Sequence, residues 1–255
     1  MSPDSMKLLD ADRLFPAEPR VRAIAQRLYA EVRGLPLVSP HGHTQAGWFA
    51  RNEAFPDPAK LLIQPDHYVF RMLYSQGVAL EDLEIGAEAI EDPRKVWRIF
   101  AEHYYLFRGT PTRMWLDFVF EELFGLTERL SAANADHYFD VIAERLQTPE
   151  FRPRALYERF GLEVLATTDS ALDSLADHAA IRDSEWKVRG AAPRILPTFR
   201  PDEVVDPDFD GFAANLAKLG ELTGEDTHKW GGYLAALATT RARFKELGCT
   251  ATDHG

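Results

Sequence analysis

Two histidines separated by one residue, His41 and His43, have the clearest potential for chemistry in this sequence. They directly follow a short apolar run that ends at Ser39. On an extended backbone, side chains two residues apart point to the same side, so both imidazoles can approach one point beyond a strand end. Neutral imidazole nitrogens are common ligands of divalent metals, most plausibly zinc here. The spacing therefore predicts a metal site. Gly42 has no side chain, so the opposite side of the backbone can pack closely against its neighbours. The alternative is a loop whose histidines hydrogen-bond the backbone.

Polar residues also follow three later apolar segments, which the sequence predicts to be strands. These segments cover about residues 162–168, 195–199 and 249–252. In a parallel barrel the catalytic groups gather at the carboxyl ends of the strands, because the loops there surround one opening. We therefore expect the polar residues after these segments to meet the two histidines at one site.

The types of these polar residues suggest individual roles. Arg200 carries a permanently charged fork that suits a carboxylate, and a structural ion pair with Asp202 is the alternative. His254 suits a third metal ligand or a general acid and base. Asp169 is expected to cap the helix that follows it rather than to act in catalysis.

A second candidate pair, His67 and Tyr68, lies at the predicted start of a helix. Asp66 precedes the pair and is a residue type that commonly caps helices. By default both side chains lie on a helix surface. The alternative is that they reach the proposed site from a long insertion.

The elements that must position these groups fall into three parts. Residues 1–55 are predicted to hold a leader, a first helix and the first strand. Residues 56–150 carry apolar side chains at helical spacing, which predicts an all-helical insertion with aromatic residues in its core. Residues 151–255 alternate between predicted strands and helices, which is typical of a parallel α/β sheet.

Composition excludes several classes of partner. The 255 residues carry a formal net charge of −11, so a nucleic-acid or anionic membrane surface is not expected. Cys249 is the single cysteine, which excludes an intramolecular disulfide and fits a reducing compartment. No apolar run approaches the ~20 residues needed to span a bilayer, and no basic, then apolar, secretory signal opens the chain. A cytoplasmic protein is expected.

Several longer motifs resemble those of the uronate (glucuronate) isomerases of the amidohydrolase superfamily, and the likeness runs over essentially the whole chain. The run from Pro197 to Asp202 is the most specific, whereas His-x-His indicates only the superfamily. The motifs are His41-Gly42-His43, Asp66-His67-Tyr68 with Arg71, Trp115 with Phe124-Gly125-Leu126, Thr167-Thr168-Asp169 with Asp173-Ser174-Leu175, Pro197-Thr198-Phe199-Arg200-Pro201-Asp202, and Thr252-Asp253-His254.

The resemblance implies a distorted (β/α)8 barrel of the TIM type, with an all-helical insertion after the first strand. It also implies the interconversion of D-glucuronate with D-fructuronate, and of D-galacturonate with D-tagaturonate. Such an isomerisation moves a proton from C2 to C1 through an enediol, so it needs positioned acid and base groups and stabilisation of the developing oxyanion.

The resemblance also implies a role for each matching residue. His41 and His43 correspond to the zinc ligands, and Arg200 corresponds to the group that grips the sugar's C6 carboxylate. His67 and Tyr68 correspond to a pair that contacts the substrate, with Tyr68 as a proton donor or acceptor. His254 corresponds to a later barrel histidine near the metal and the sugar oxygens, and it is taken as catalytic.

The sequence departs from the family pattern in two respects. Gly42 and Thr44 replace a larger residue and a leucine, which indicates a divergent branch. About four strands are visible, and the expected later aspartate, arginine and tryptophan are missing. We therefore expect the N-terminal portion of a longer enzyme, inactive by itself and possibly homo-oligomeric. A metal-dependent hydrolase on the same scaffold and a non-catalytic sugar-acid-binding fragment are the alternatives.

Overall fold

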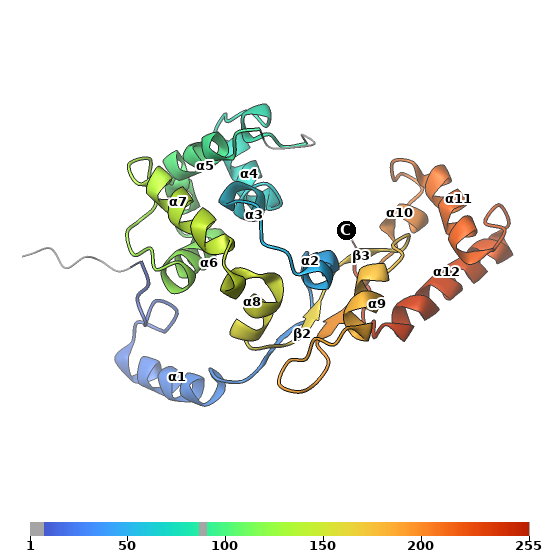
Figure 1. Ribbon diagram of the computed structural model, residues 1–255, viewed down its shortest axis with the longest axis horizontal. Coiled ribbons are helices and arrows are strands. Elements are labelled where there is room, and N and C mark those ends of the chain that lie inside the picture. The colour runs from blue at the N-terminus through green and yellow to red at the C-terminus, as the bar shows by residue number, and fades with distance from the viewer. Residues whose placement is uncertain (1–7, 87–90, 255) are drawn as a thin grey trace, which may run out of the picture. The chain divides into compact units, whose positions relative to one another are not determined.

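The chain divides into two units, and all the strands of its described residues lie in one of them. A computed structural model describes residues 8–86 and 91–254 (Figure 1). The helical unit comprises Met1–Gly34 and Ala54–Arg152, and the strand unit comprises Leu35–Glu53 and Pro153–Gly255. The helical unit is therefore interrupted in sequence by the first part of the strand unit.

The described residues of the helical unit form helices and turns. In the sequence, Asp92-Pro93 and Thr110-Pro111 each predict the start of a helix, because a capping residue precedes proline. Both starts are confirmed, since the side chains of Asp92 and Thr110 accept hydrogen bonds from backbone N–H groups of the first turns of α5 and α6. The elements are α1 (Pro19–Val32), α3 (Pro58–Leu62), α4 (His67–Tyr74), η1 (Glu81–Leu83), α5 (Pro93–Glu102), η2 (Tyr104–Phe107), α6 (Pro111–Phe118), η3 (Val119–Leu123), α7 (Ala135–Leu146) and η4 (Pro149–Phe151).

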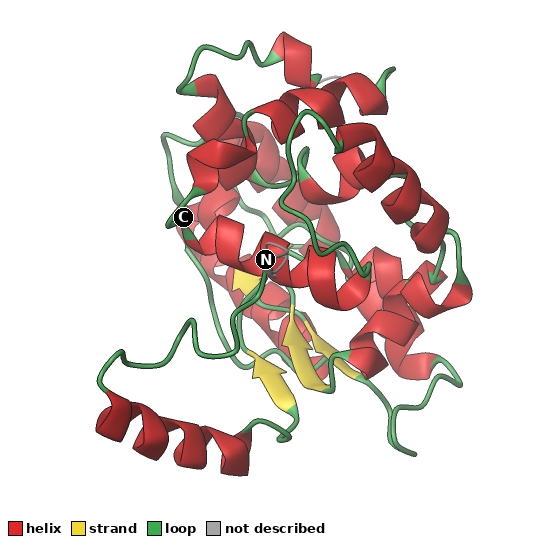
Figure 2. Ribbon diagram, turned by 90° about the vertical axis from the view of Figure 1, so that its left-hand side faces the viewer, coloured by secondary structure: helices red, strands yellow, loops and turns green. Residues whose placement is uncertain are grey.

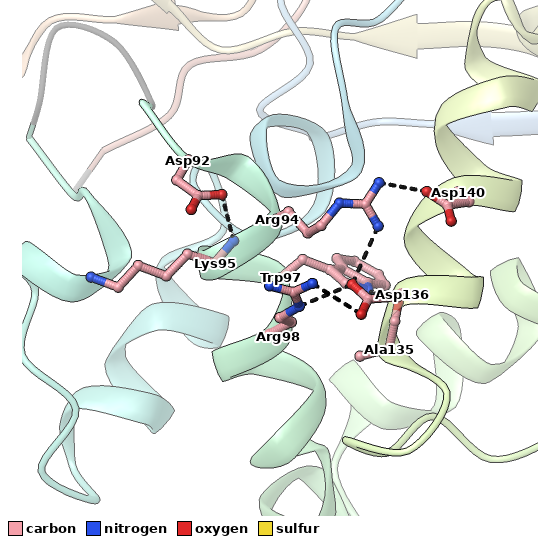
Figure 3. A network of polar contacts seen from close by, with 8 residues as sticks. All are labelled: Asp92, Arg94, Lys95, Trp97, Arg98, Ala135, Asp136 and Asp140. Carbon is pink, nitrogen blue, oxygen red and sulfur yellow. Dashed lines mark hydrogen bonds and ion pairs between the residues drawn. The ribbon is translucent and has the colours of Figure 1, made fainter.

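Aromatic side chains form much of the core of the helical unit, as their spacing predicted. Trp97 is fully buried, lies against Phe100 and Phe120 with ring centroids 5.4 and 6.2 Å away, and donates its indole N–H to the carbonyl oxygen of Ala135. Figure 3 shows that charged residues surround this contact between α5 and α7, where Arg98 binds Asp136 through two hydrogen bonds of 2.9 and 3.0 Å. An apolar centre with a charged border thus joins the two helices.

Helix α1 differs from its neighbours, because none of its described side chains is buried. It forms where the spacing of its apolar residues predicted a helix. Those residues are nevertheless exposed by between 43% and 67%, namely Val21, Ile24, Leu28 and Val32. Its apolar side therefore contributes little to the core of the helical unit.

The strand unit contains short parallel strands connected through helices. The strands are β1 (Leu37–Ser39), β2 (Leu162–Ala166), β3 (Asp169–Ser170), β4 (Arg194–Leu196) and β5 (Phe199–Arg200). The helices are α2 (Ala46–Arg51), α8 (Pro153–Arg159), α9 (Ala176–Asp183), α10 (Asp202–Val205), α11 (Phe212–Thr223) and α12 (Trp230–Glu246). The predicted mixed α/β class is confirmed.

Neighbouring strands follow the order of the sequence. One sheet has the order β1-β2-β4 and a second pairs β3 with β5, and every pairing in them is parallel (Figure 2). The predicted strand at 249–252 forms only one parallel bridge, between Thr252 and Phe199. The described residues thus form small parallel sheets, whereas the barrel remains a prediction.

Two local predictions are wrong. Asp169 does not cap a helix, because it lies in β3 and the next helix, α9, begins only at Ala176. The apolar residues Phe212, Leu216 and Leu219, followed by a glycine, predict a helix that ends at Gly220, but α11 continues to Thr223. Gly224, with φ of 75°, follows the last turn of α11, a left-handed conformation that glycine adopts without steric cost.

Arg154 of α8 holds the residues around the end of α2. Its guanidinium donates hydrogen bonds of 2.8 and 3.0 Å to the carbonyl oxygens of Phe49 and Ala50. Its backbone N–H donates to the side-chain oxygen of Asn52 at 3.1 Å. These contacts close the strand unit just where the chain leaves for Ala54–Arg152 and returns from it.

Helix α12 contains a buried threonine hydroxyl. Thr240 is fully buried, and its Oγ1 has no hydrogen-bond partner among the described residues. Because an unpaired buried hydroxyl costs about 1–3 kcal/mol, we expect Thr240→Val to raise the free energy of unfolding by about 1 kcal/mol, as measured by urea titration. An unchanged or lower value would show that the hydroxyl has a partner, such as water.

The described helices include none that is long and apolar enough to cross a membrane.

Candidate functional site

The two histidines of the His-x-His motif lie side by side after β1. Their ring centroids are 5.1 Å apart and the ring planes meet at 77°. Both residues are exposed. The short strand ends at Ser39, so the two side chains follow directly after the end of the strand.

Asp253 connects the first histidine to Arg200. Its Oδ1 lies 3.9 Å from Nδ1 of His41, and its Oδ2 lies 3.5 Å from Nε of Arg200. Nε of Arg200 is also 3.5 Å from Oδ2 of Asp202, which is the ion pair that sequence offered as the structural alternative. The backbone explains the placement, because Asp253 N–H donates to the carbonyl oxygen of Phe199, the neighbour of Arg200.

Sequence reasoning placed Asp253 at a strand end but gave it no role. The available signal was its position directly before His254, in the segment expected to run parallel to the strand of Arg200. Strand pairing then decides which of the two faces the site: Asp253 is half-buried beside Arg200, and His254 is exposed.

Two neighbouring cavities lie beside these residues within the strand unit. The larger, of about 440 Å³, is lined by Arg200, Asp202, Glu203, Asp206 and Phe209, together with Thr168 and Ser170. The smaller, of about 260 Å³, shares Thr168 and Ser170 and is lined also by His43, Asp169 and His178. One cavity thus holds the cationic fork and the other borders the second histidine, with Thr168 in the wall of both.

A buried polar network lies beneath the smaller cavity. Thr167 Oγ1 is 2.6 Å from Oδ2 of Asp169 and 2.9 Å from Nε2 of His178. If the threonine donates to the carboxylate, His178 must donate from Nε2. Burial raises the pKa of Asp169, against the hydrogen bond from Thr167, and lowers the pKa of His178, against the nearby carboxylates.

The lowered pKa of His178 predicts a pH dependence of stability. The unfolded chain binds a proton at His178 more readily than the folded protein does below about pH 6.5. The free energy of unfolding should therefore fall as pH falls from about 7 to 5, by about 1.4 kcal/mol for each unit of pKa lowering. Asp169 has the opposite sign, because its raised pKa adds stability as pH falls toward that value.

Urea titrations at the two pH values test this expectation. His178→Asn should reduce the fall in stability. His137→Asn should leave it unchanged, because His137 is exposed on α7. An equal fall in the wild type and in His178→Asn would contradict the assignment.

The remaining predicted residues are placed as follows. His67 and Tyr68 form the first turn of α4, where the carboxylate of Asp66 accepts the N–H of Tyr68. Their rings are 4.2 Å apart, and Tyr68 is 68% exposed. This matches the helix-surface position expected by default. The pair belongs to the helical unit, so its approach to the strand unit remains a prediction.

The donor set near the histidines suits a divalent ion in part. His41 and His43 offer two nitrogen ligands, and the buried Oδ2 of Asp253 accepts no hydrogen bond from the described residues. No group of three or more His, Cys, Asp or Glu in the described part of the chain is arranged to hold a metal. Two imidazoles supply half of a four-coordinate zinc site, so further ligands would be required.

Gly42 is not required sterically at its position. A Cβ placed there would lie 3.5 Å from the carbonyl oxygen of Ala166, an ordinary contact, and its φ is not left-handed. Gly42→Ala should therefore raise the free energy of unfolding by about 0.4–1 kcal/mol, because alanine restricts the unfolded chain. Urea titration measures the change. A loss of stability would indicate a strained turn.

Comparisons with known proteins show the family of this chain. A family model described as glucuronate isomerase matches residues 19–255. Uronate isomerase of Rhizobium meliloti (strain 1021) is 60% identical over 252 residues, which cover 97% of this chain and 53% of that protein. Uronate isomerase of Xanthomonas campestris pv. campestris (strain B100) is 54% identical over 252 residues, which cover 97% of this chain and 52% of that protein. The chain thus spans about half the length of the curated relatives that it matches.

Solved structures give the same result for the fold. The crystal structure of glucuronate isomerase from Caulobacter crescentus superposes with a TM-score of 0.92 at 47% identity, covering 98% of this chain and 52% of that one. Uronate isomerase from Thermotoga maritima gives a TM-score of 0.80 at 32% identity, covering 91% and 49%.

Parallel strands that end in histidine, arginine and carboxylate side chains beside a cavity define an α/β protein with its polar site at the strand ends. The sequence and structure matches then specify which one: the chain belongs to the glucuronate isomerase family.

Proposed function

We propose that this chain forms part of a uronate isomerase, which interconverts D-glucuronate with D-fructuronate and D-galacturonate with D-tagaturonate. Membership of the glucuronate isomerase family carries the proposal. The position of Arg200 in a cavity of about 440 Å³ supports a small acidic substrate. The sequential order of parallel neighbours supports a (β/α)8 barrel as the complete architecture.

In the proposed mechanism, Arg200 binds the C6 carboxylate of the sugar. Asp202 and Asp253 both approach its Nε, so they restrain the guanidinium before the substrate arrives. Anchoring the remote carboxylate orients C1 and C2 for reaction, which can supply a large part of the rate. Tyr68 and His254 are the proposed groups for moving the proton between C2 and C1, with His67 as a further substrate contact.

His41 and His43 are the residues proposed to hold a divalent ion, most plausibly zinc. When bound, such an ion supplies electrostatic stabilisation of oxygen atoms that gain negative charge. Their exposure leaves the imidazoles accessible to an ion.

The decisive experiment incubates the polypeptide encoded by the complete gene with D-glucuronate in D2O. We expect the ketouronate, with deuterium at C1, because an enediol takes up a solvent proton there. Chelation should lower the rate and zinc should restore it. Formation of no ketouronate would contradict the proposal. In a parallel assay with an ester or an amide as substrate, a product formed by addition of water would indicate a hydrolase instead. Binding of the sugar acid without turnover would indicate a non-catalytic protein.

A further inference from the structure

A hydrogen bond between distant parts of the chain holds residues 40–43, the irregular turn that carries the two histidines. Thr168 Oγ1 donates to the carbonyl oxygen of Gly42 at 3.0 Å, although 126 positions separate the two residues. On the other side of the turn, Ser39 Oγ donates to the carbonyl oxygen of His41 at 3.3 Å. Of these two bonds, the one from Thr168 connects the turn to the neighbouring strand segment, and the one from Ser39 connects it to its own strand.

Thr168 is itself held in place by its two neighbours. Thr167 N–H donates to the carbonyl oxygen of Leu196, and Asp169 N–H donates to that of Thr198, each at 3.0 Å. The Asp169 carboxylate accepts from Thr167 Oγ1 and from Thr198 N–H. On an extended segment, residues 167 and 169 face one side and residue 168 faces the other. The buried network therefore fixes the backbone from which Thr168 reaches Gly42.

The acceptor of this bond lies between the two imidazoles in the sequence. The Gly42 carbonyl belongs to the peptide unit that joins Gly42 to His43, so fixing its plane restricts how His43 leaves the turn relative to His41. The turn has little burial to restrain it, because both histidines are exposed. A single charge-neutral hydroxyl can thus control the relative orientation of the pair.

We propose that Thr168 is a positioning residue for the His41–His43 pair and acts through its hydroxyl on the Gly42 carbonyl. What His41 and His43 bind rests on the proposed function. The fixed orientation of the turn does not, because it can be tested without any ion. Outer partners that orient metal-binding residues commonly change metal affinity by about 10- to 100-fold.

The first test reads the turn directly in the 255-residue chain without metal. Gly42–His43 is the only Gly-His pair in the sequence, so labelling glycine carbonyls with ¹³C and histidine amides with ¹⁵N gives one carbonyl-amide signal. Thr168→Val, which keeps the side-chain shape but removes the donor, should move this carbonyl signal upfield and broaden it. Thr168→Ser, which keeps the donor, should leave the signal at its wild-type position.

The second test measures zinc affinity by competition with a chelating dye. Thr168→Val should bind zinc about tenfold more weakly, and Thr168→Ser should remain within about twofold of wild type. Thr240→Val is the matched control, because it removes a threonine hydroxyl that does not contact the turn. Thr168→Ala, which also lacks the donor, replaces the valine variant if that variant does not fold.

The outcomes separate the two proposals. An unchanged Gly42 signal in Thr168→Val would overturn the positioning role, as would a shifted signal with unchanged zinc affinity. A wild-type chain that binds no zinc would count against the proposed metal site. A shifted signal in Thr168→Val would then still support the fixed turn.

Discussion

Arg200→Met is expected to lower kcat/KM for D-glucuronate by about 10²- to 10⁴-fold. The methionine cannot form the two charge-assisted hydrogen bonds that a guanidinium makes with a carboxylate, each worth about 1.5–3 kcal/mol. It also leaves Asp202 and Asp253, which lie 3.5 Å from Nε, to repel the substrate carboxylate. Arg200→Lys should lose about 10- to 100-fold, because a single ammonium keeps the charge but not the paired geometry. Steady-state kinetics of the complete enzyme measures both.

Arg194→Met is the matched control. Arg194 lies on β4, the strand that precedes β5 in the sequence, and its side chain is 56% exposed in an ion pair with Glu163. Exposed ion pairs of this kind contribute about 0–1 kcal/mol, so kinetics should remain near wild type. Full activity of Arg200→Met together with reduced stability would show that Arg200 serves only its structural ion pairs.

Trp97→Ala is expected to lower the free energy of unfolding of the helical unit by about 3–5 kcal/mol. The substitution leaves a cavity among Phe100, Phe120 and Phe139 and removes the partner of the Ala135 carbonyl. Figure 3 shows the indole at the junction of α5 and α7, so the loss should separate the two helices. Urea titration followed by circular dichroism at 222 nm measures the change.

Tyr74→Ala is the corresponding control, since Tyr74 is an aromatic residue of the same unit and is 59% exposed at the end of α4. We expect a change within about 0.5 kcal/mol, as for other surface substitutions. Equal losses from Trp97→Ala and Tyr74→Ala would show that the aromatic core does not determine the stability of the helical unit.

Regular patterns allowed much of the secondary structure to be predicted. β1 occupies the residues expected, and the segments around residues 162–168 and 195–199 form parallel strands, because runs of apolar and β-branched residues bounded by turns fit a buried sheet. The helix starts at Pro93 and Pro111 followed from a capping side chain before proline. These features depend on residues that are close together in the sequence, so they can be predicted from the sequence alone.

Features that depend on distant parts of the chain were harder to predict. Asp169 looked like a helix cap, yet its carboxylate accepts hydrogen bonds from Thr167 and from Thr198, a residue of the next strand segment. The sequence around His178 did not indicate that this side chain is buried, although it lies against Thr167 in the structure. The choice of Asp253 rather than His254 beside Arg200 also required the strand pairing.

The clasp made by Arg154 bears on how this architecture can change over time. Because it joins the two points between which the intervening hundred or so residues emerge, their ends stay together whatever lies between them. Closing a flexible loop costs only about 0.6 kcal/mol more for each doubling of its length. During evolution, the segment Ala54–Arg152 could therefore be lengthened, shortened or replaced at small energetic cost. The pairing of β1 with β2 and the polar residues at the strand ends would remain unchanged.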